Sequence, residues 1–166
     1  MKKSFKIAGI HPAYFKLEKT GKEFMQKGNR PYLCLQLQVR ADLLVSIPFR
    51  SHVNHENKFK TFGNKGLDYT KAIFVNEIYL VNLGRCIHYT DYIKIRDNIK
   101  KIETDINNFF DKYKELLSKT SLTEAEQNIL KYSTLQYFHT ELNITKNESK
   151  LATSNEKDET EVEYNG

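Results

Sequence analysis

The sequence predicts an α+β domain in which a small, mostly antiparallel sheet from the first half of the chain is covered by helices from the second half. Over residues 2–83, apolar residues alternate with polar ones in short runs separated by Pro, Gly and charged turns, as in strands. From about residue 90 the apolar spacing changes to three and four, as in amphipathic helices. A length of 166 residues suits one domain.

Each expected strand follows from a run of alternating residues. The first covers residues 2–10, and a stronger one covers residues 32–39, followed by a tight turn and a returning strand over residues 43–48. Because proline has no N–H to donate to a sheet ladder, we expect Pro48 to end the returning strand or to place it at an edge. Residues 69–83 return to strand character, with a turn expected at Asn76 and Glu77 between two strands.

Between these strands, residues 49–67 contain few apolar side chains and many His, Asn, Lys and Gly. We expect them to form one long polar loop outside the sheet. Such loops are uncommon in a compact domain and often carry function. This loop is therefore where a functional site is expected.

Two helices are expected in the second half. The first covers residues 90–118, where apolar residues recur at spacings of four and three: Ile95, Ile99, Ile102, Ile106, Phe109, Tyr113 and Leu116. Thr123 and Glu126 have the spacing of a capping box, which predicts a second helix to about Leu142. We expect both apolar stripes to pack on the sheet. The alternative is a dimeric scaffold in which residues 90–118 of two copies pair as a coiled coil.

The composition excludes several classes of protein. Two cysteines, Cys34 and Cys86, are too few for a disulfide framework or a four-cysteine zinc site. No apolar run approaches the roughly 20 residues of a membrane span, and the first residues do not resemble a secretory signal. These features predict a cytoplasmic, reduced protein without a membrane partner. We expect one domain over residues 1–144 and an acidic, disordered tail over residues 145–166.

Charge is divided unevenly along the chain. Residues 1–100 carry 18 Lys and Arg against 8 Asp and Glu, a net of +10, whereas residues 101–166 carry 8 against 13, a net of −5. A basic first part that is also rich in Tyr and Phe favours a polyanionic partner, and RNA or DNA is the usual one.

The polar loop offers side chains for several kinds of chemistry, most of which can be set aside. His52 and His55 are too few for a zinc site, which needs three or four ligands, so no metal or other cofactor is expected. Ser51 lies in Phe-Arg-Ser-His-Val and not in the glycine-flanked turn of a serine hydrolase. Residues 63–66 do not have the pattern of a phosphate-binding glycine loop, which disfavours nucleotide hydrolysis.

Metal-independent RNA cleavage fits the remaining groups. This reaction needs a base for the ribose 2′-OH, an acid for the leaving 5′-oxygen and positive charge near the phosphate. Arg50 can hold a phosphate through two hydrogen bonds, Ser51 can donate to it, and a histidine can move protons near neutral pH. Further charges and rings for RNA come from Lys58, Lys60, Lys71, Tyr32 and Tyr69.

The sequence resembles the endoribonuclease toxins of type III toxin–antitoxin systems in three segments that occur in the same order. They are Asn-Arg-Pro-Tyr-Leu at 29–33, Ile-Pro-Phe-Arg-Ser-His at 47–52 and Gly-Leu-Asp-Tyr-Thr-Lys-Ala at 66–72. The branch that it most resembles is TenpIN, whose relatives include ToxN and AbiQ. The resemblance spans roughly residues 5–140 in the order of strands, polar loop and helix.

The resemblance implies a compact, twisted antiparallel sheet with flanking helices, similar to ToxN and the MazF-like ribonucleases. It implies a sequence-selective, metal-independent endoribonuclease that leaves 2′,3′-cyclic phosphate ends on cellular or phage RNA. It also implies a small antitoxin RNA of tandem repeats, which the toxin cuts into single repeats and which inhibits it in a ring-shaped protein–RNA assembly. Release of the toxin during phage infection then halts the host cell, as in abortive infection.

By position, the resemblance implies that Ser51 and Arg50 lie in the active site and that Arg30 faces the RNA. ToxN-like members carry a lysine where this sequence has Val53, so another group must replace that charge, and Asn54, His55 and Lys58 are the nearby candidates. We expect His55, because of its proximity, to act as an acid or base. The expected catalytic set is Ser51, Arg50, His55 and Lys71, with Lys71 stabilising the phosphorane, and the expected RNA-binding set is Arg30, Tyr32, His52, Lys58, Lys60 and Tyr69.

An alternative from another class is a non-catalytic RNA-binding module that uses the same basic and aromatic surface. The two hypotheses differ at Ser51→Ala. An enzyme loses cleavage and still binds RNA, whereas a binding module has no cleavage to lose.

Overall fold

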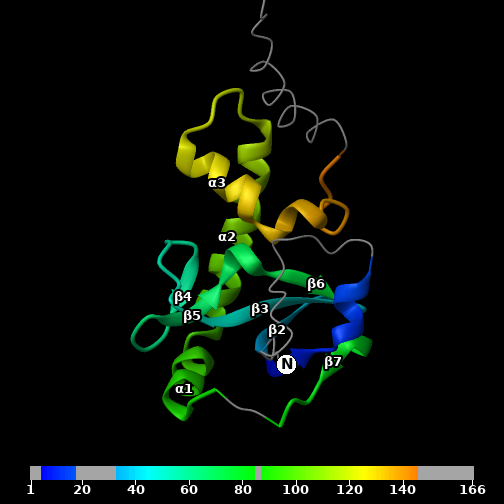
Figure 1. Cartoon of the computed structure of the whole chain (residues 1–166), viewed down its shortest axis with the longest axis vertical. Coiled ribbons are helices and arrows are strands. Elements are labelled where there is room, and N and C mark those ends of the chain that lie inside the picture. The colour runs from blue at the N-terminus through cyan, green and yellow to red at the C-terminus, as the bar shows by residue number, and fades with distance from the viewer. Residues whose placement is uncertain (1–4, 18–32, 85–86, 146–166) are drawn as a thin grey trace, which may run out of the picture.

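A computed structural model describes residues 5–17, 33–84 and 87–145; the expected acidic tail lies almost entirely outside these ranges. The described residues form an α+β fold, which confirms the predicted fold class (Figure 1). Seven of their strands form one antiparallel sheet in the order β4-β5-β3-β2-β1-β7, with β6 beside β3. The strands are β1 (Lys6–Ile10), β2 (Leu33–Arg40), β3 (Leu43–Ser51), β4 (Lys58–Lys60), β5 (Lys65–Asp68), β6 (Ile73–Val75) and β7 (Leu80–Val81).

Strand β3 is central and changes its partner along its length. On one side it pairs with β2, and on the other it pairs with β6 through residues 44–46 and then with β5 through residues 49–51. Pro48 stands between the last two pairings and remains in register with Cys34 of β2. The expectation that Pro48 ends the strand or marks an edge is therefore wrong. The change of partner interrupts the ladder on that side, and a residue without an N–H is tolerated at such an interruption.

The polar run over residues 49–67 is not the single loop that its composition suggests. Strand β3 extends to Ser51, and β4 and β5 form a hairpin that adds two strands to the sheet. Phe59 and Leu67 pair across this hairpin and are only 6% and 0% exposed. Gly66 is required beside them, because a Cβ there would collide with the carbonyl oxygen of Phe59. Two buried apolar side chains and one glycine thus specify a hairpin within a polar segment.

Short 3₁₀ helices connect several of the strands. The first, η1 (Pro12–Lys16), begins after His11, whose Nδ1 accepts a hydrogen bond of 3.1 Å from the Ala13 N–H. The run over residues 69–83 was expected to be two strands separated by a turn at Asn76 and Glu77. It contains β6 and β7 with η3 (Glu77–Tyr79) between them, and it begins with η2 (Tyr69–Lys71), which was not expected. Aspartate or asparagine side chains cap both of these turns, which explains why the strand pattern is interrupted there.

The long predicted helix is two helices, α1 (Tyr89–Asp97) and α2 (Ile99–Ser118). Asn98 separates them with φ −116° and ψ 17°, while the apolar stripe continues across the break. On α2 the buried residues are Ile102, Ile106, Phe109, Phe110, Tyr113, Leu116 and Leu117. They pack inside this chain, which confirms the predicted core packing and leaves the stripe unavailable for a coiled coil with a second copy.

Helix α3 (Glu124–Tyr132) begins with the predicted capping box, in which the Thr123 N–H donates to Glu126 Oε2 over 2.9 Å. It ends at Tyr132 and does not continue to Leu142. Ser133 stops it, because its hydroxyl caps the 3₁₀ helix η4 (Thr134–Tyr137) by accepting from the Leu135 N–H over 3.2 Å.

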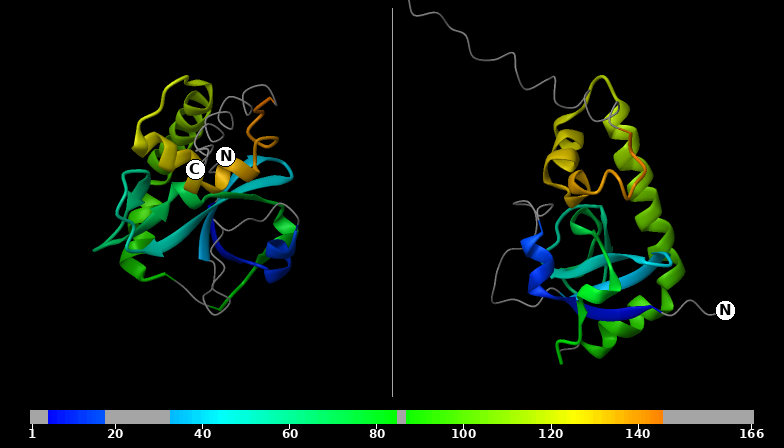
Figure 2. Two further views of the ribbon diagram at one scale, coloured as in Figure 1. Left: turned by 45° about the horizontal axis from the view of Figure 1, so that its top comes forward. Right: turned by 90° about the vertical axis from the view of Figure 1, so that its right-hand side faces the viewer.

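The helices form a layer against the sheet. Helix α2 runs along one face of the sheet, and α3 and η4 turn back toward it from the far end of α2 (Figure 2). Between the layers, the Phe74 ring of β6 lies 5.5 Å from that of Phe110 and 5.6 Å from that of Phe138. The β4–β5 hairpin lies at the side of the sheet, close to α1 (Figure 1). No described helix is both long and apolar enough to cross a membrane.

Candidate functional site

A buried carboxylate organises the side of the sheet where β3, β4 and β5 meet. Asp68, the last residue of β5, has a side chain that is 0% exposed. Its Oδ1 accepts from the Thr70 N–H over 3.0 Å and from the Thr70 hydroxyl over 2.7 Å, which starts the η2 turn. The local sequence therefore fixes this carboxylate as a turn cap before any distant residue reaches it.

Two predicted site residues contact Asp68. Arg50 of β3 forms an ion pair with Oδ2, and His55 Nε2 lies 3.2 Å from Oδ1. Burial by itself raises the pKa of the Asp68 carboxyl, but hydrogen bonds from His55 and Thr70, with the charges of His55 and Arg50, hold the pKa below its ordinary value. Asp68 is therefore ionised near neutral pH and orients both basic side chains.

The contact with Asp68 determines the tautomer of a neutral His55. A ring that donates from Nε2 to the carboxylate carries its free lone pair on Nδ1. This Nδ1 is buried and has no hydrogen-bond partner among the described residues, although 38% of the His55 side chain is exposed. A buried acceptor without a partner is costly, so this nitrogen is a place where a proton donor would be stabilised.

Ser51 and His52 flank this cluster and are both exposed. Ser51 ends β3 opposite Lys65, and strand alternation turns its side chain to the face opposite that of Arg50. His52 has a φ of 59°, a left-handed conformation in which the chain leaves the strand. The structure thus brings Arg50 and His55 together and holds Ser51 beside them on the other face.

The two predicted lysines of β4 differ in their environments. Lys58 is opposite Asp68 in the β4–β5 register, and its Nζ donates to the carbonyl oxygen of Val53. This bond closes the segment that carries His55. Lys60 is exposed two residues further along β4.

Tyr69 corrects one expectation. It is only 3% exposed, so little of its ring is open for a base to stack on. Its hydroxyl donates to Asp105 Oδ2 of α2 over 3.4 Å, and burial together with Asp105 raises its pKa. Its neighbour in sequence, Asp68, was not predicted to have a role.

Lys71, also predicted for the site, extends from η2 to the end of α3. The Lys71 Nζ donates over 2.6 Å to the carbonyl oxygen of Tyr132, at the end of α3. Arg30 and Tyr32 lie outside the described residues.

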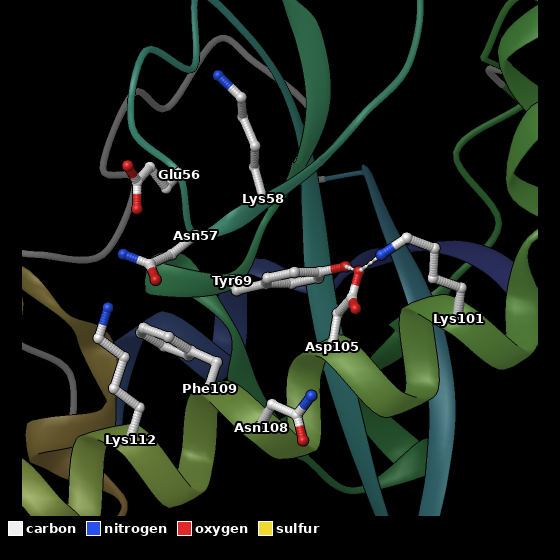
Figure 3. A pocket seen from close by; sticks show the side chains of 9 residues that line it. All are labelled: Glu56, Asn57, Lys58, Tyr69, Lys101, Asp105, Asn108, Phe109 and Lys112. Atoms are coloured by element: carbon white, nitrogen blue, oxygen red, sulfur yellow. Dashed lines mark hydrogen bonds and ion pairs between the residues drawn. The ribbon is translucent and has the colours of Figure 1, made fainter.

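A pocket of about 330 Å³ adjoins the cluster, between the residues that lead into β4, the η2 turn and α2 (Figure 3). Its lining residues are Glu56, Asn57, Lys58, Tyr69, Lys101, Asp105, Asn108, Phe109 and Lys112. The Tyr69 ring spans it, and the Tyr69 hydroxyl points to Asp105 (Figure 3). Lys101 Nζ lies 2.6 Å from Asp105 Oδ2 and offsets that charge, so the lining is basic overall.

Sequence reasoning missed the contribution of α2 to this pocket. Lys101, Asp105, Asn108 and Lys112 recur at spacings of four, three and four, which places them on one stripe of the helix. This polar stripe runs beside the buried apolar stripe of α2. Both stripes can be found in the sequence from residues that recur at spacings of three and four. A polar stripe at helical spacing is common on any solvated helix, so the signal becomes specific only when the sheet is placed beside it.

Among the described residues, no group of three or more His, Cys, Asp and Glu side chains is arranged to hold a metal ion. Comparisons of the chain with protein-family models, with curated proteins and with solved structures find no significant match.

Proposed function

We propose that this protein is a metal-independent endoribonuclease of the type III toxin–antitoxin kind, on the TenpIN branch, with a ToxN- and MazF-like sheet. The observation that supports it best is His55, held by the buried carboxylate of Asp68 with Nδ1 unpartnered, next to Arg50. The resemblance in the segments around Ser51 and Asp68 supports the same reaction class.

The proposed reaction is transesterification within one nucleotide. Once neighbouring side chains move to uncover it, His55 Nδ1 takes the proton of the ribose 2′-OH, the 2′-oxygen bonds to phosphorus, and the bond from phosphorus to the 5′-oxygen breaks. Arg50 offsets the charge that builds up on the phosphate. Ser51 lies on the opposite face but is the last residue of β3, and it donates a hydrogen bond to the phosphate around the end of the strand. An acid from the exposed segment after Ser51, which begins with His52, returns a proton to the leaving oxygen. The products are a 2′,3′-cyclic phosphate and a 5′-hydroxyl.

The test is an RNA cleavage assay with purified protein, mixed cellular RNA and excess EDTA. We expect discrete cuts with cyclic phosphate ends, and a loss of rate of about 10²- to 10⁴-fold in His55→Gln. His11→Gln is the matched control, because His11 caps the η1 turn and lies on a different segment. Equal rates for His55→Gln and His11→Gln would show that His55 is not the base.

Membership of a toxin–antitoxin system makes a further prediction about partners. A transcript of short tandem repeats encoded directly upstream of this chain should bind the protein, inhibit its cleavage of other RNA and be cut into single repeats. Sedimentation of the mixture should show a closed assembly containing both RNA and protein. An upstream region without such repeats, or a transcript that leaves cleavage unchanged, would contradict this part of the proposal.

A non-catalytic RNA-binding module is the second candidate. It is favoured by the burial of His55 Nδ1, which no substrate hydroxyl reaches unless neighbouring side chains move. RNA that shifts on a gel with the wild-type protein and remains uncut in the assay above would establish this reading.

A further inference from the structure

Phe62 is an exposed aromatic residue at the turn of the β4–β5 hairpin. Its side chain is 52% exposed, although phenylalanine gains much of its stabilising effect from burial. The turn is a closed one, because the Thr61 N–H donates to the Lys65 carbonyl oxygen over 2.9 Å and the Lys65 N–H donates to that of Phe62 over 3.3 Å. The backbone therefore displays this ring at a defined place.

Contacts with α1 hold the turn in position. The Phe62 N–H donates over 3.2 Å to Oδ1 of Asp91, whose residue is only 1% exposed. Lys65 Nζ lies 3.7 Å from the other oxygen of Asp91, and Lys94 Nζ donates over 3.3 Å to the Thr61 carbonyl oxygen. A turn with this many anchors has little freedom to lose on binding, so the ring is preorganised.

Lys94 also places a positive charge over the Phe62 ring. Its Nζ lies 5.1 Å from the ring centroid, within the range of a cation–π contact. An ammonium group beside an exposed ring is the combination that single-stranded nucleic-acid binders use, because the ring stacks on a base and the charge attracts the phosphate. Duplex RNA hides its base faces and does not fit this arrangement.

The ring lies close to the candidate cleavage site. Ser51 is paired with Lys65 across β3 and β5, and Phe62 is three residues from Lys65 in sequence. At about 3.3 Å per residue of extended chain, Phe62 is within about 10 Å of Lys65, and the antiparallel pairing adds about 5 Å to reach Ser51. A strand of RNA with its phosphate at Ser51 can therefore place a neighbouring base on Phe62.

We propose that Phe62 and Lys94 form a stacking platform for an unpaired nucleotide next to the cleaved phosphate, so that the substrate class is single-stranded RNA. This inference rests on the proposed function, because it takes RNA as the ligand and Ser51 as the place of the phosphate.

The absence of tryptophan from the chain allows a direct test. Phe62→Trp introduces a single tryptophan at the platform, and its fluorescence should be quenched when a base stacks on it. The probe is a mixed-sequence 2′-O-methyl oligoribonucleotide, which lacks the attacking hydroxyl and stays intact. Ile78→Trp is the matched control, because Ile78 is 78% exposed on η3. We expect quenching only in Phe62→Trp, and only with the single strand and not with its duplex.

A second variant measures how much the platform contributes to RNA binding. Phe62→Ala should weaken binding of the same probe by about 5- to 150-fold and raise KM for cleavage with kcat unchanged. Phe62→Tyr, which keeps the ring, should bind like the wild type.

The outcomes separate the two proposals. Cleavage with unchanged KM in Phe62→Ala, or RNA binding without quenching in Phe62→Trp, overturns the platform and leaves the ribonuclease. Quenching and weakened binding in a protein that cuts no RNA support the platform and overturn the ribonuclease. A wild-type protein that binds no RNA overturns both.

Discussion

Asp68 and Asp91 are both buried aspartates that hold the β4–β5 hairpin, yet their partners differ in kind. Asp68 is 0% exposed and receives two basic side chains, Arg50 and His55. Asp91 is 1% exposed and receives a backbone N–H, from Phe62, and the ammonium group of a lysine. Both carboxylates have partners on each oxygen, as buried charges require.

The difference lies in what the partners can do. A backbone N–H never titrates, so the Asp91 contacts fix a turn and do nothing further. His55 is an imidazole, which can accept and donate a proton, and its Nδ1, on the far side of the ring from Asp68, has no hydrogen-bond partner among the described residues. A buried carboxylate therefore indicates chemistry only when one of its partners can pass a proton onward.

The largest effect that separates the two aspartates is on cleavage rate. We expect Asp68→Asn to lower kcat by at least about 10²-fold, because the neutral amide no longer stabilises a protonated His55. The amide oxygen still accepts from Thr70, so the η2 turn is retained. Asp91→Asn should keep kcat and raise KM, because it loosens only the turn that displays Phe62. Single-turnover cleavage of a labelled RNA measures both, and equal kcat values for the two variants would contradict the comparison.

Truncating each aspartate should also rank them by stability. Asp68→Ala leaves Arg50 without its partner and should cost about 3 kcal/mol of the free energy of unfolding. Asp91→Ala leaves the Phe62 N–H unsatisfied and should cost about 1–2 kcal/mol. Urea denaturation at neutral pH measures both values. Asp97→Ala, whose side chain is 54% exposed, is the control and should change stability by less than about 0.5 kcal/mol.

Acid should remove the stabilising effect of Asp68. Its carboxyl pKa is held below the ordinary 3.8, so the stability that it contributes is present above that value and is lost as pH falls through the lower folded-state pKa. Asp68→Asn lacks this contribution at every pH. The difference in Tm between the wild type and this variant should therefore shrink as pH falls from about 5 to about 2. A constant difference over this range would show that Asp68 is not the group that titrates.

The smallest predicted effect concerns the pocket beside Asp68. Lys112 lines this pocket, whereas Lys114 lies on the same helix and reaches toward Asp111 at 4.0 Å. If Lys112 contacts one RNA phosphate, Lys112→Ala should reduce the slope of log affinity against log salt by about 0.7, the value for one contact on a single strand. Lys114→Ala should leave the slope unchanged. Binding titrations at several salt concentrations measure this slope. Equal slopes for both variants would show that RNA does not contact the pocket.

Much of the fold was predictable because its signals are local. The alternation that predicts β2, the capping box of α3 and the apolar stripe of α2 each depend on residues a few positions apart. The errors came from long-range pairing. Strand β3 continues past Pro48 because its pairing on one side changes there from β6 to β5. The polar hairpin forms because Phe59 and Leu67 are buried against distant residues.

Sequence reasoning named two of the side chains that contact Asp68 and did not name Asp68 itself. Arg50 and His55 were identified from residue type and proximity in sequence. Asp68 was passed over, because only the pairing of β3 with β5 brings it to them. Tyr69 was expected to be open to RNA, but α2 packs over it. No pattern in the sequence shows this packing, so the expectation was wrong.

The change of partner along β3 divides the sheet into two parts that should open with different free energies. Residues 44–46 are bonded between β2 and β6 inside the core, whereas residues 49–51 are bonded to the β4–β5 hairpin at its side. In a hydrogen-exchange experiment, amides of the first group should exchange only through global unfolding, and those of β5 through a smaller, separate opening. Such an opening would part Asp68 from Arg50 while residues 44–46 stay paired, so the site would be dismantled and rebuilt without global unfolding.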